Sequence, residues 1–231
     1  MGARSKQTVL ANLERVREGI TEACARVGRD PQGVRIVAAG KTVQPEALEW
    51  VLEAGNRDLA ENYVKELRVK RAVLTDAIWH FIGNLQSHTA HQVADLADVV
   101  QSVVPGSALA RLGRRAVAGG RILPVLVEVD LTEVRSGVPP QEVLAACDAV
   151  ASTAGLRLAG LMTVPPLTRT AEEARPYFAR LRGLLEAVVG DHPRCVELSM
   201  GMSLDYQVAV EEGATMVRIG TALFCERPPT G

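Results

Sequence analysis

The sequence lacks the features that mark several classes of protein. No apolar run reaches the length of a membrane-spanning helix, and the first six residues have no apolar core like that of a signal peptide. The formal net charge is −1 and no basic stripe stands out, so nucleic acid is not an expected partner. These absences predict a cytoplasmic protein that binds neither nucleic acid nor a membrane.

Metal and disulfide sites are not expected either. Four cysteines occur at widely separated positions, without a C-x-x-C pair: Cys24, Cys147, Cys195 and Cys225. Such spacing indicates reduced, mostly buried thiols. His88 and His91 are three residues apart and could share a helix face. Because no further ligands lie near them in the sequence, surface histidines are the better interpretation than a metal site.

Apolar and amphipathic segments alternate along the chain after one leading amphipathic helix at about 8–27. Strands are predicted at 34–41, 58–60, 78–82, 99–103, 122–129, 158–162, 196–199 and 216–219. Helices are predicted between them, among them 63–74, 107–117, 140–154, 171–189 and 204–212. This alternation implies a parallel sheet with right-handed crossovers.

Eight such units in about 200 residues fit a closed (β/α)₈ TIM barrel, an α/β fold. An open doubly wound sheet is the alternative, but no G-x-G-x-x-G follows the first strand. No linker or low-complexity segment divides the chain. We therefore expect a single domain over 1–231, with the leading helix in 1–30 and the barrel over 34–225.

The first predicted strand ends on Lys41. Burial at the end of an apolar strand would lower the pKa of the ammonium and leave more of it as free amine. A free amine can attack an aldehyde and form a Schiff base. The alternative is a lysine that reaches solvent from the strand end.

The loops after the seventh and eighth predicted strands are rich in small residues. Ser199, Gly201 and Ser203 lie just before a predicted helix, and Gly220 and Thr221 form a second small-residue turn. In a barrel of this kind, these two loops commonly hold phosphate through backbone N–H groups. Two ordinary helix caps are the alternative.

Arg218 lies within the apolar strand 216–219. An arginine inside a barrel needs a carboxylate or a ligand nitrogen as its partner. Together with Lys41 and the two anion loops, it suggests pyridoxal 5′-phosphate (PLP) as a ligand. A sugar-phosphate aldolase with a Schiff-base lysine is also consistent with these residues.

Six motifs occur in an order that resembles the pyridoxal phosphate homeostasis protein family (the YggS/PROSC group). They lie at 37–42 (VAAGKT), 61–66 (ENYVKE), 79–87 (WHFIGNLQS), 160–162 (GLM), 199–203 (SMGMS) and 217–224 (VRIGTALF). The resemblance spans nearly the whole chain. It implies a barrel like the N-terminal domain of alanine racemase, with PLP held as an aldimine on Lys41.

The resemblance also implies roles for individual residues. Phosphate contacts fall on Ser199, Met200, Gly220 and Thr221 with Ser203 close by, the arginine facing the pyridine nitrogen is Arg218, and Asn62 and His80 line the cofactor. An arginine beside that nitrogen keeps it unprotonated and makes the cofactor a weaker electron sink. The implied role is binding and buffering the cofactor and delivering it to PLP-dependent apo-enzymes, without evident catalysis. A ring of solvated helices is compatible with a monomer or a weak dimer.

Some positions depart from the family pattern. Gly40 replaces a serine or threonine, Ala60 replaces a glycine, His88 and Thr89 replace Asn-Lys, and Cys225 replaces a glycine. The missing lysine at 89 removes a cation that we expect near the mouth of the barrel. If these changes had cost the chain its ligand, a structural or interaction barrel would remain.

The alternative function is that of a minimal PLP-dependent amino-acid racemase. Racemisation needs a second acid/base on the opposite face of the cofactor. In alanine racemase a second domain supplies a tyrosine there, and we expect no such domain in a chain that ends at Gly231. Tyr63, Tyr177 and Tyr206 all fall in predicted helices, so none is an evident replacement.

Overall fold

Eight parallel strands close into a barrel in the computed structural model, which describes residues 5–132 and 137–225. The strands are β1 (Arg35–Ala39), β2 (Asp58–Glu61), β3 (Ile78–Phe81), β4 (Val99–Val103), β5 (Leu123–Glu128), β6 (Leu156–Met162), β7 (Glu197–Ser199) and β8 (Met216–Ile219). Each strand pairs with the next, and β8 pairs with β1 in the register Val37 to Arg218. The predicted TIM barrel is therefore confirmed, and the open sheet is excluded.

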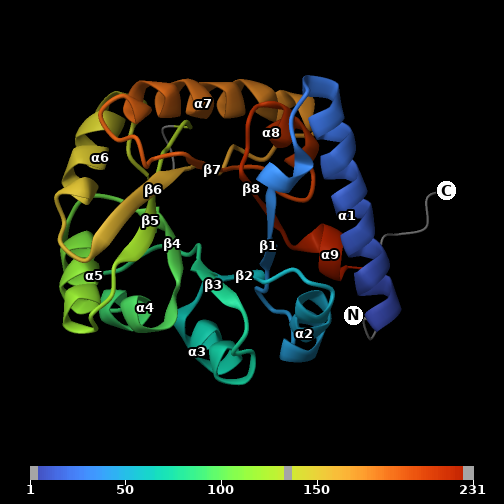
Figure 1. Cartoon of the computed structure of the whole chain (residues 1–231), viewed down its shortest axis with the longest axis horizontal. Helices are drawn as coiled ribbons and strands as arrows, with labels where there is room; N and C mark the ends of the chain where they lie inside the picture. The colour runs from blue at the N-terminus through green and yellow to red at the C-terminus, as the bar shows by residue number, and fades with distance from the viewer. Residues whose placement is uncertain (1–4, 133–136, 226–231) are drawn as a thin grey trace.

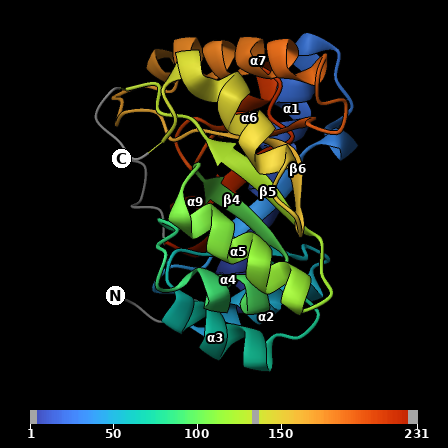
Figure 2. The ribbon, with the colours of Figure 1, turned by 90° about the vertical axis from the view of Figure 1, so that its left-hand side faces the viewer.

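Helices follow the strands and cover the outside of the barrel (Figure 1). They are α1 (Lys6–Val27), α2 (Pro45–Glu53), α3 (Val64–Val73), α4 (Ala90–Leu96), α5 (Ser107–Ala118), α6 (Val143–Ala151), α7 (Arg175–Val189), α8 (Tyr206–Glu211) and α9 (Thr221–Phe224). The leading helix α1 contacts α2, α8 and α9, so it covers the seam where β8 meets β1. Figure 2 shows α4 beside α5 and α6 beside α7 on the outer surface.

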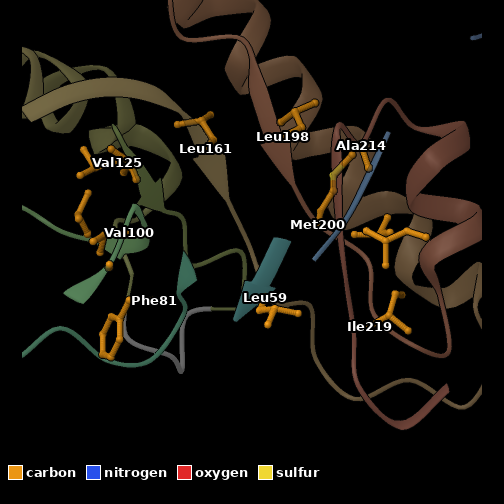
Figure 3. Close-up of a cluster of buried hydrophobic side chains, with 14 of the residues drawn as sticks. Leu59, Phe81, Val100, Val125, Leu161, Leu198, Met200, Ala214 and Ile219 are labelled. Atoms are coloured by element: carbon orange, nitrogen blue, oxygen red, sulfur yellow. The ribbon is translucent and has the colours of Figure 1, made fainter. Parts of the chain in front are cut away.

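The main hydrophobic core lies between the strands and these helices. Outward-facing side chains from successive strands contribute to it, including Leu59, Phe81, Val100, Val125, Leu161, Leu198 and Ile219 (Figure 3). A second, smaller cluster fills the barrel interior with residues such as Val37, Leu126 and Met162. Because side chains alternate along a strand, the apolar strands can supply both layers.

A register shift in β4 changes which side chains face inward. Val100 pairs with Val125, whereas Val103 pairs with Val127, so an irregularity falls on Gln101 and Ser102. Val100 and Val103 are three residues apart, yet both belong to the outer core. Gln101 faces the interior by ordinary alternation after Val99 and Val100, and the bulge returns Val103 to the outer core. Such irregularities are common near sites.

The turn after β7 depends on a glycine and a buried carboxylate. Gly201 has φ +88°, and a Cβ there would lie 2.5 Å from the Cβ of Ala209. Asp205 precedes α8 and accepts a hydrogen bond of 2.6 Å from the N–H of Met202. Burial raises the pKa of Asp205, although the Met202 N–H and the charge of Arg218 oppose the shift. The carboxylate thus holds the turn at an electrostatic cost.

Substitutions at Gly160, on β6, and at Gly183, on α7, form a matched pair that tests the packing between strands. In Gly160→Ala the new Cβ would lie 2.0 Å from the carbonyl oxygen of Glu197 on β7, so we expect a loss of stability of about 1–3 kcal/mol. In Gly183→Ala, within α7, nothing lies within 4 Å, and the better helix former should add about 0.5–1 kcal/mol. Urea unfolding of both variants measures the difference, and equal effects would contradict this packing.

Replacing the buried carboxylate should change how stability depends on pH. The raised pKa of Asp205 means that its contribution to stability is fully present below about pH 3.9, the unfolded value, and is lost as the pH rises through the folded value. Asparagine keeps the acceptor for Met202 but carries no charge. Relative to the parent, Asp205→Asn should therefore gain stability between about pH 4 and pH 7. The urea midpoints of the parent and the variant at about pH 4 and pH 7 provide the measurement. A stability difference between the two proteins that does not change with pH would contradict the prediction.

Candidate functional site

A cavity of about 690 Å³ opens at the carboxyl ends of the strands. Its polar lining comes from Lys41, Asn62, Glu128, Ser203, Arg218 and Thr221. Its apolar walls include Ile82, Met162, Val164 and Phe224. The cavity is within the usual size range of small-molecule sites, and it lies at the face where barrels of this class carry their sites.

Lys41 does not lie where the sequence predicted. Strand β1 ends at Ala39, and Lys41 follows in a turn, exposed to solvent at the edge of the cavity. Its Nζ lies 5.8 Å from the centre of the Tyr63 ring, within range of a cation–π contact. Of the two interpretations of this lysine, burial is therefore wrong, and the alternative that it reaches solvent from the strand end is confirmed.

Thr42, directly after Lys41, has φ +61°. It is the only non-glycine residue with positive φ among residues 5–132 and 137–225. Such strain is uncommon outside sites where the surrounding structure enforces it. The turn that carries Lys41 is therefore held in an unusual conformation by its neighbours.

A buried ion pair supports this turn from below. The ammonium of Lys70, on α3, is 7% exposed and donates to Glu61, to the carbonyl of Gly40 (2.8 Å) and to Glu66 (3.2 Å). Burial raises the pKa of Glu61, and the Lys70 ammonium opposes that shift. Lys70 thus links Gly40, the residue before Lys41, to Glu61 at the end of β2, directly before Asn62.

Two glycines fit this support closely. A Cβ at Gly40 would lie 2.8 Å from the Glu61 carboxylate and 3.1 Å from Leu48. A Cβ at Gly83 would lie 1.9 Å from the carbonyl oxygen of Asn62. The departure at Gly40 therefore leaves room for Glu61, and Gly83 lets the loop after β3 press against the backbone that presents Asn62 to the cavity.

Arg218 forms the base of the cavity. It is 5% exposed, and its guanidinium donates to the Ser199 hydroxyl at 2.6 Å and to the Thr163 carbonyl at 2.8 Å. Burial lowers the pKa of Arg218 to about 10, against the opposing charges of Glu128 and Asp205. The side chain therefore stays charged at neutral pH and offers only donors to a ligand.

The loops after β7 and β8 meet at one wall of the cavity. Ser203 Oγ accepts from the N–H of Ala222 at 3.0 Å, which leaves its own proton free to donate. Among the residues that the structure describes, no group accepts a hydrogen bond from the N–H of Gly220 or Thr221. Hydroxyl and backbone donors of this kind can bind an anion such as a phosphate.

Other predicted site residues lie deeper than expected. Met200 belongs to the outer hydrophobic core, and its N–H donates to the Met216 carbonyl. The Ser199 hydroxyl is bonded to Arg218 and Gln101, and His80 is fully buried between Gln101 and Asp58. None of the three predicted residues lines the cavity, so Ser199 and His80 can act on a ligand only through other residues.

The remaining departures fall in three places. Ala60 packs in the barrel interior, Cys225 lines the cavity, and His88 and Thr89 do neither. All four cysteines are free thiols, and three of them are buried. Tyr63 caps α3 instead of lying within it and is 52% exposed, so the prediction that every tyrosine lies in a helix is wrong at this position.

Several contributors were not identified from the sequence. Glu128 lines the cavity, Lys70 supports the Lys41 turn, and Gln101 contacts His80 and Ser199. The signal available in the sequence, for Glu128 and Gln101, was a polar residue inside an otherwise apolar strand. The described residues hold no cluster of three or more potential metal ligands, and none of their helices is long and apolar enough to cross a membrane.

Comparisons with known proteins agree with this geometry. Residues 7–228 match the family model described as the alanine racemase N-terminal domain. The pyridoxal phosphate homeostasis protein of Pseudomonas aeruginosa is 39% identical over 225 residues, covering 95% of this chain and 96% of that protein. The protein of the same name from Aquifex aeolicus is 36% identical over 220 residues, covering 93% of this chain and 96% of its own length.

A solved structure extends the similarity to three dimensions. PipY of Synechococcus elongatus PCC7942, determined with PLP bound, is 34% identical and superposes with a TM-score of 0.79. The match covers 89% of this chain and 99% of PipY. The family that the motifs indicated is therefore confirmed, and this chain belongs to the pyridoxal phosphate homeostasis proteins, whose barrel is the alanine racemase N-terminal domain.

Proposed function

We propose that this protein binds pyridoxal 5′-phosphate in the cavity at the carboxyl ends of its strands and serves cofactor homeostasis in the cytoplasm. The observation that carries the proposal is the set of complementary groups around one cavity. An amine lies at its edge, free backbone donors lie on one wall, and a guanidinium forms its base. These match the aldehyde, the phosphate and the ring nitrogen of PLP.

Lys41 is the residue proposed to attach the cofactor. The chain has four lysines. Lys6 is paired with Glu53, Lys70 is buried against Glu61, and Lys65 lies on the exposed face of α3. Lys41 alone among them lines the cavity, so its amine is the one in position to bind an aldehyde covalently.

The other groups would orient the ligand. The hydroxyls of Ser203 and Thr221 and the N–H groups of Gly220 and Thr221 would hold the phosphate. The Arg218 guanidinium can only donate, so an unprotonated ring nitrogen is its complement. Asn62 lines the cavity beside Lys41, where its amide can contact a ring substituent. Ser199 and His80 would act through other residues, and Met200, in the outer core, would support the loop after β7.

The proposed role is binding, buffering and delivering the cofactor to apo-enzymes. PLP supplies an electron sink for carbanions when its ring nitrogen is protonated. A guanidinium at that position disfavours the protonated ring, which supports a carrier rather than a racemase. The names of the curated relatives point the same way.

The visible spectrum with added PLP tests the attachment site. We expect the parent to develop the visible absorption of a PLP Schiff base, and Lys41→Ala to lack it because no other lysine reaches the cavity. Lys65→Ala is the matched control and should keep the absorption. A parent without absorption would refute the proposed function, and an absorbing Lys41→Ala would refute the assignment of the lysine.

A pair of assays separates the carrier from the racemase. The PLP-loaded protein, mixed with the apo form of a PLP-dependent enzyme, should restore that enzyme's activity. With L-alanine it should form no more D-alanine than Lys41→Ala does, since a guanidinium faces the ring nitrogen. Accumulation of D-alanine well beyond the amount of protein present would establish the racemase instead.

A further inference from the structure

A continuous chain of hydrogen bonds crosses the barrel interior from the cavity to the opposite face. Arg218 donates to Ser199 at 2.6 Å, and Ser199 donates to Gln101 Oε1 at 2.6 Å. Gln101 Nε2 lies 2.8 Å from His80 Nδ1, and His80 Nε2 lies 2.8 Å from Asp58 Oδ1. Four of these side chains are buried, and Asp58 lies at the edge of a second, open cavity with Arg35.

The two ends of this chain fix its direction. A guanidinium has no acceptor, so Arg218 must donate to Ser199; an ionised carboxylate has no donor, so Asp58 must accept from His80. Between them Ser199 donates to the Gln101 oxygen, and the Gln101 nitrogen donates to His80 Nδ1. A single set of donors is therefore consistent, with His80 neutral and its proton on Nε2.

We infer that Gln101 and His80 are positioning residues for Arg218, and that through it they set the affinity for the cofactor ring. The guanidinium donates to the Ser199 hydroxyl and to the Thr163 carbonyl. The Ser199 hydroxyl can accept from Arg218 in a fixed direction only while Gln101 accepts its proton. Gln101 in turn keeps that orientation only while His80 Nδ1 is unprotonated.

The burial of Gln101 gives this inference a separate structural basis. Its amide is fully buried on β4, where a register shift falls on Gln101 and Ser102, and it shares the barrel interior with Ser199 and His80. A buried polar side chain is costly unless all its bonds are made. Gln101 makes three contacts there: to Ser199, to His80 and, at 3.6 Å, to the sulfur of Met216.

The tautomer of His80 tests this chain of hydrogen bonds in the absence of any cofactor. Nitrogen NMR of the histidine-labelled protein, with the His80 signals assigned through His80→Gln, should give a neutral ring protonated on Nε2. In Gln101→Glu the new carboxylate accepts from both neighbours, so His80 should become protonated on both nitrogens. A His80 ring protonated on Nδ1 in the parent would overturn the inference.

Binding measurements test the effect on Arg218, and this part depends on the proposed function. Gln101→Met should weaken PLP binding about tenfold, while binding of inorganic phosphate stays unchanged because the phosphate loops are untouched. Gln92→Met is the control, because it makes the same exchange on α4, where Gln92 accepts from Arg68 away from the cavity. It should change neither affinity. Equal weakening of PLP and phosphate would mean that Gln101 serves only the fold.

A double-mutant cycle then shows whether Gln101 acts through Arg218. In an Arg218→Met background, or Arg218→Lys if the first variant does not fold, Gln101→Met should change PLP affinity by less than about twofold. A full additional loss would overturn the inference. If the parent binds no PLP, the proposed function fails. The His80 tautomer still decides whether the chain of hydrogen bonds exists.

Discussion

The charge of Arg218 inside a closed barrel is the constraint on which the site depends. Removing a cation from water is costly unless other groups replace its hydration. Here the replacements come from three strands or strand ends and one turn: Ser199 on β7, the Thr163 carbonyl after β6, Glu128 on β5, and Asp205 before α8. The polar interior of this barrel is therefore organised around one side chain, and its apolar layer is correspondingly small.

The two faces of each strand therefore have different roles in the structure. Outward side chains such as Leu198 and Ile219 pack against the helices and stabilise the fold (Figure 3). Inward side chains such as Ser199 and Arg218 build the site. A one-residue change of register would exchange the two sets. The pairing of β8 with β1, covered by α1, therefore both closes the barrel and directs Arg218 inward.

The alternation of strands and helices was enough to predict the barrel, because eight apolar segments of strand length leave few topologies. Even the short β2 was found. The position of Lys41 beyond its strand was missed, because apolar residues continue to Gly40 and do not reveal where pairing stops. Ser199, Met200 and His80 were placed in the right loops and strands, but a motif does not say which layer of the barrel a side chain occupies.

Contacts between distant residues account for the rest. Lys70 looks like one more charge on a helix, and only the fold brings its ammonium under the Gly40 carbonyl. Gln101 could be recognised as a polar residue in an apolar strand, yet its partners come from β3 and β7. Sequence patterns report periodicity along one segment, whereas these bonds depend on how three strands align.

The turn of Lys41 combines a rigid base with an open upper side. Below it, Lys70 and Glu61 form a buried pair whose disruption would leave an uncompensated charge, so the backbone at Gly40 is firmly held. Above it, the lysine is exposed and its Nζ lies 5.8 Å from the centre of the half-exposed Tyr63 ring. An enzyme gains from covering its reacting group and excluding water, whereas a carrier has to take up and release its ligand. A held backbone with an uncovered amine suits the second requirement, and this supports cofactor exchange as the purpose of the site.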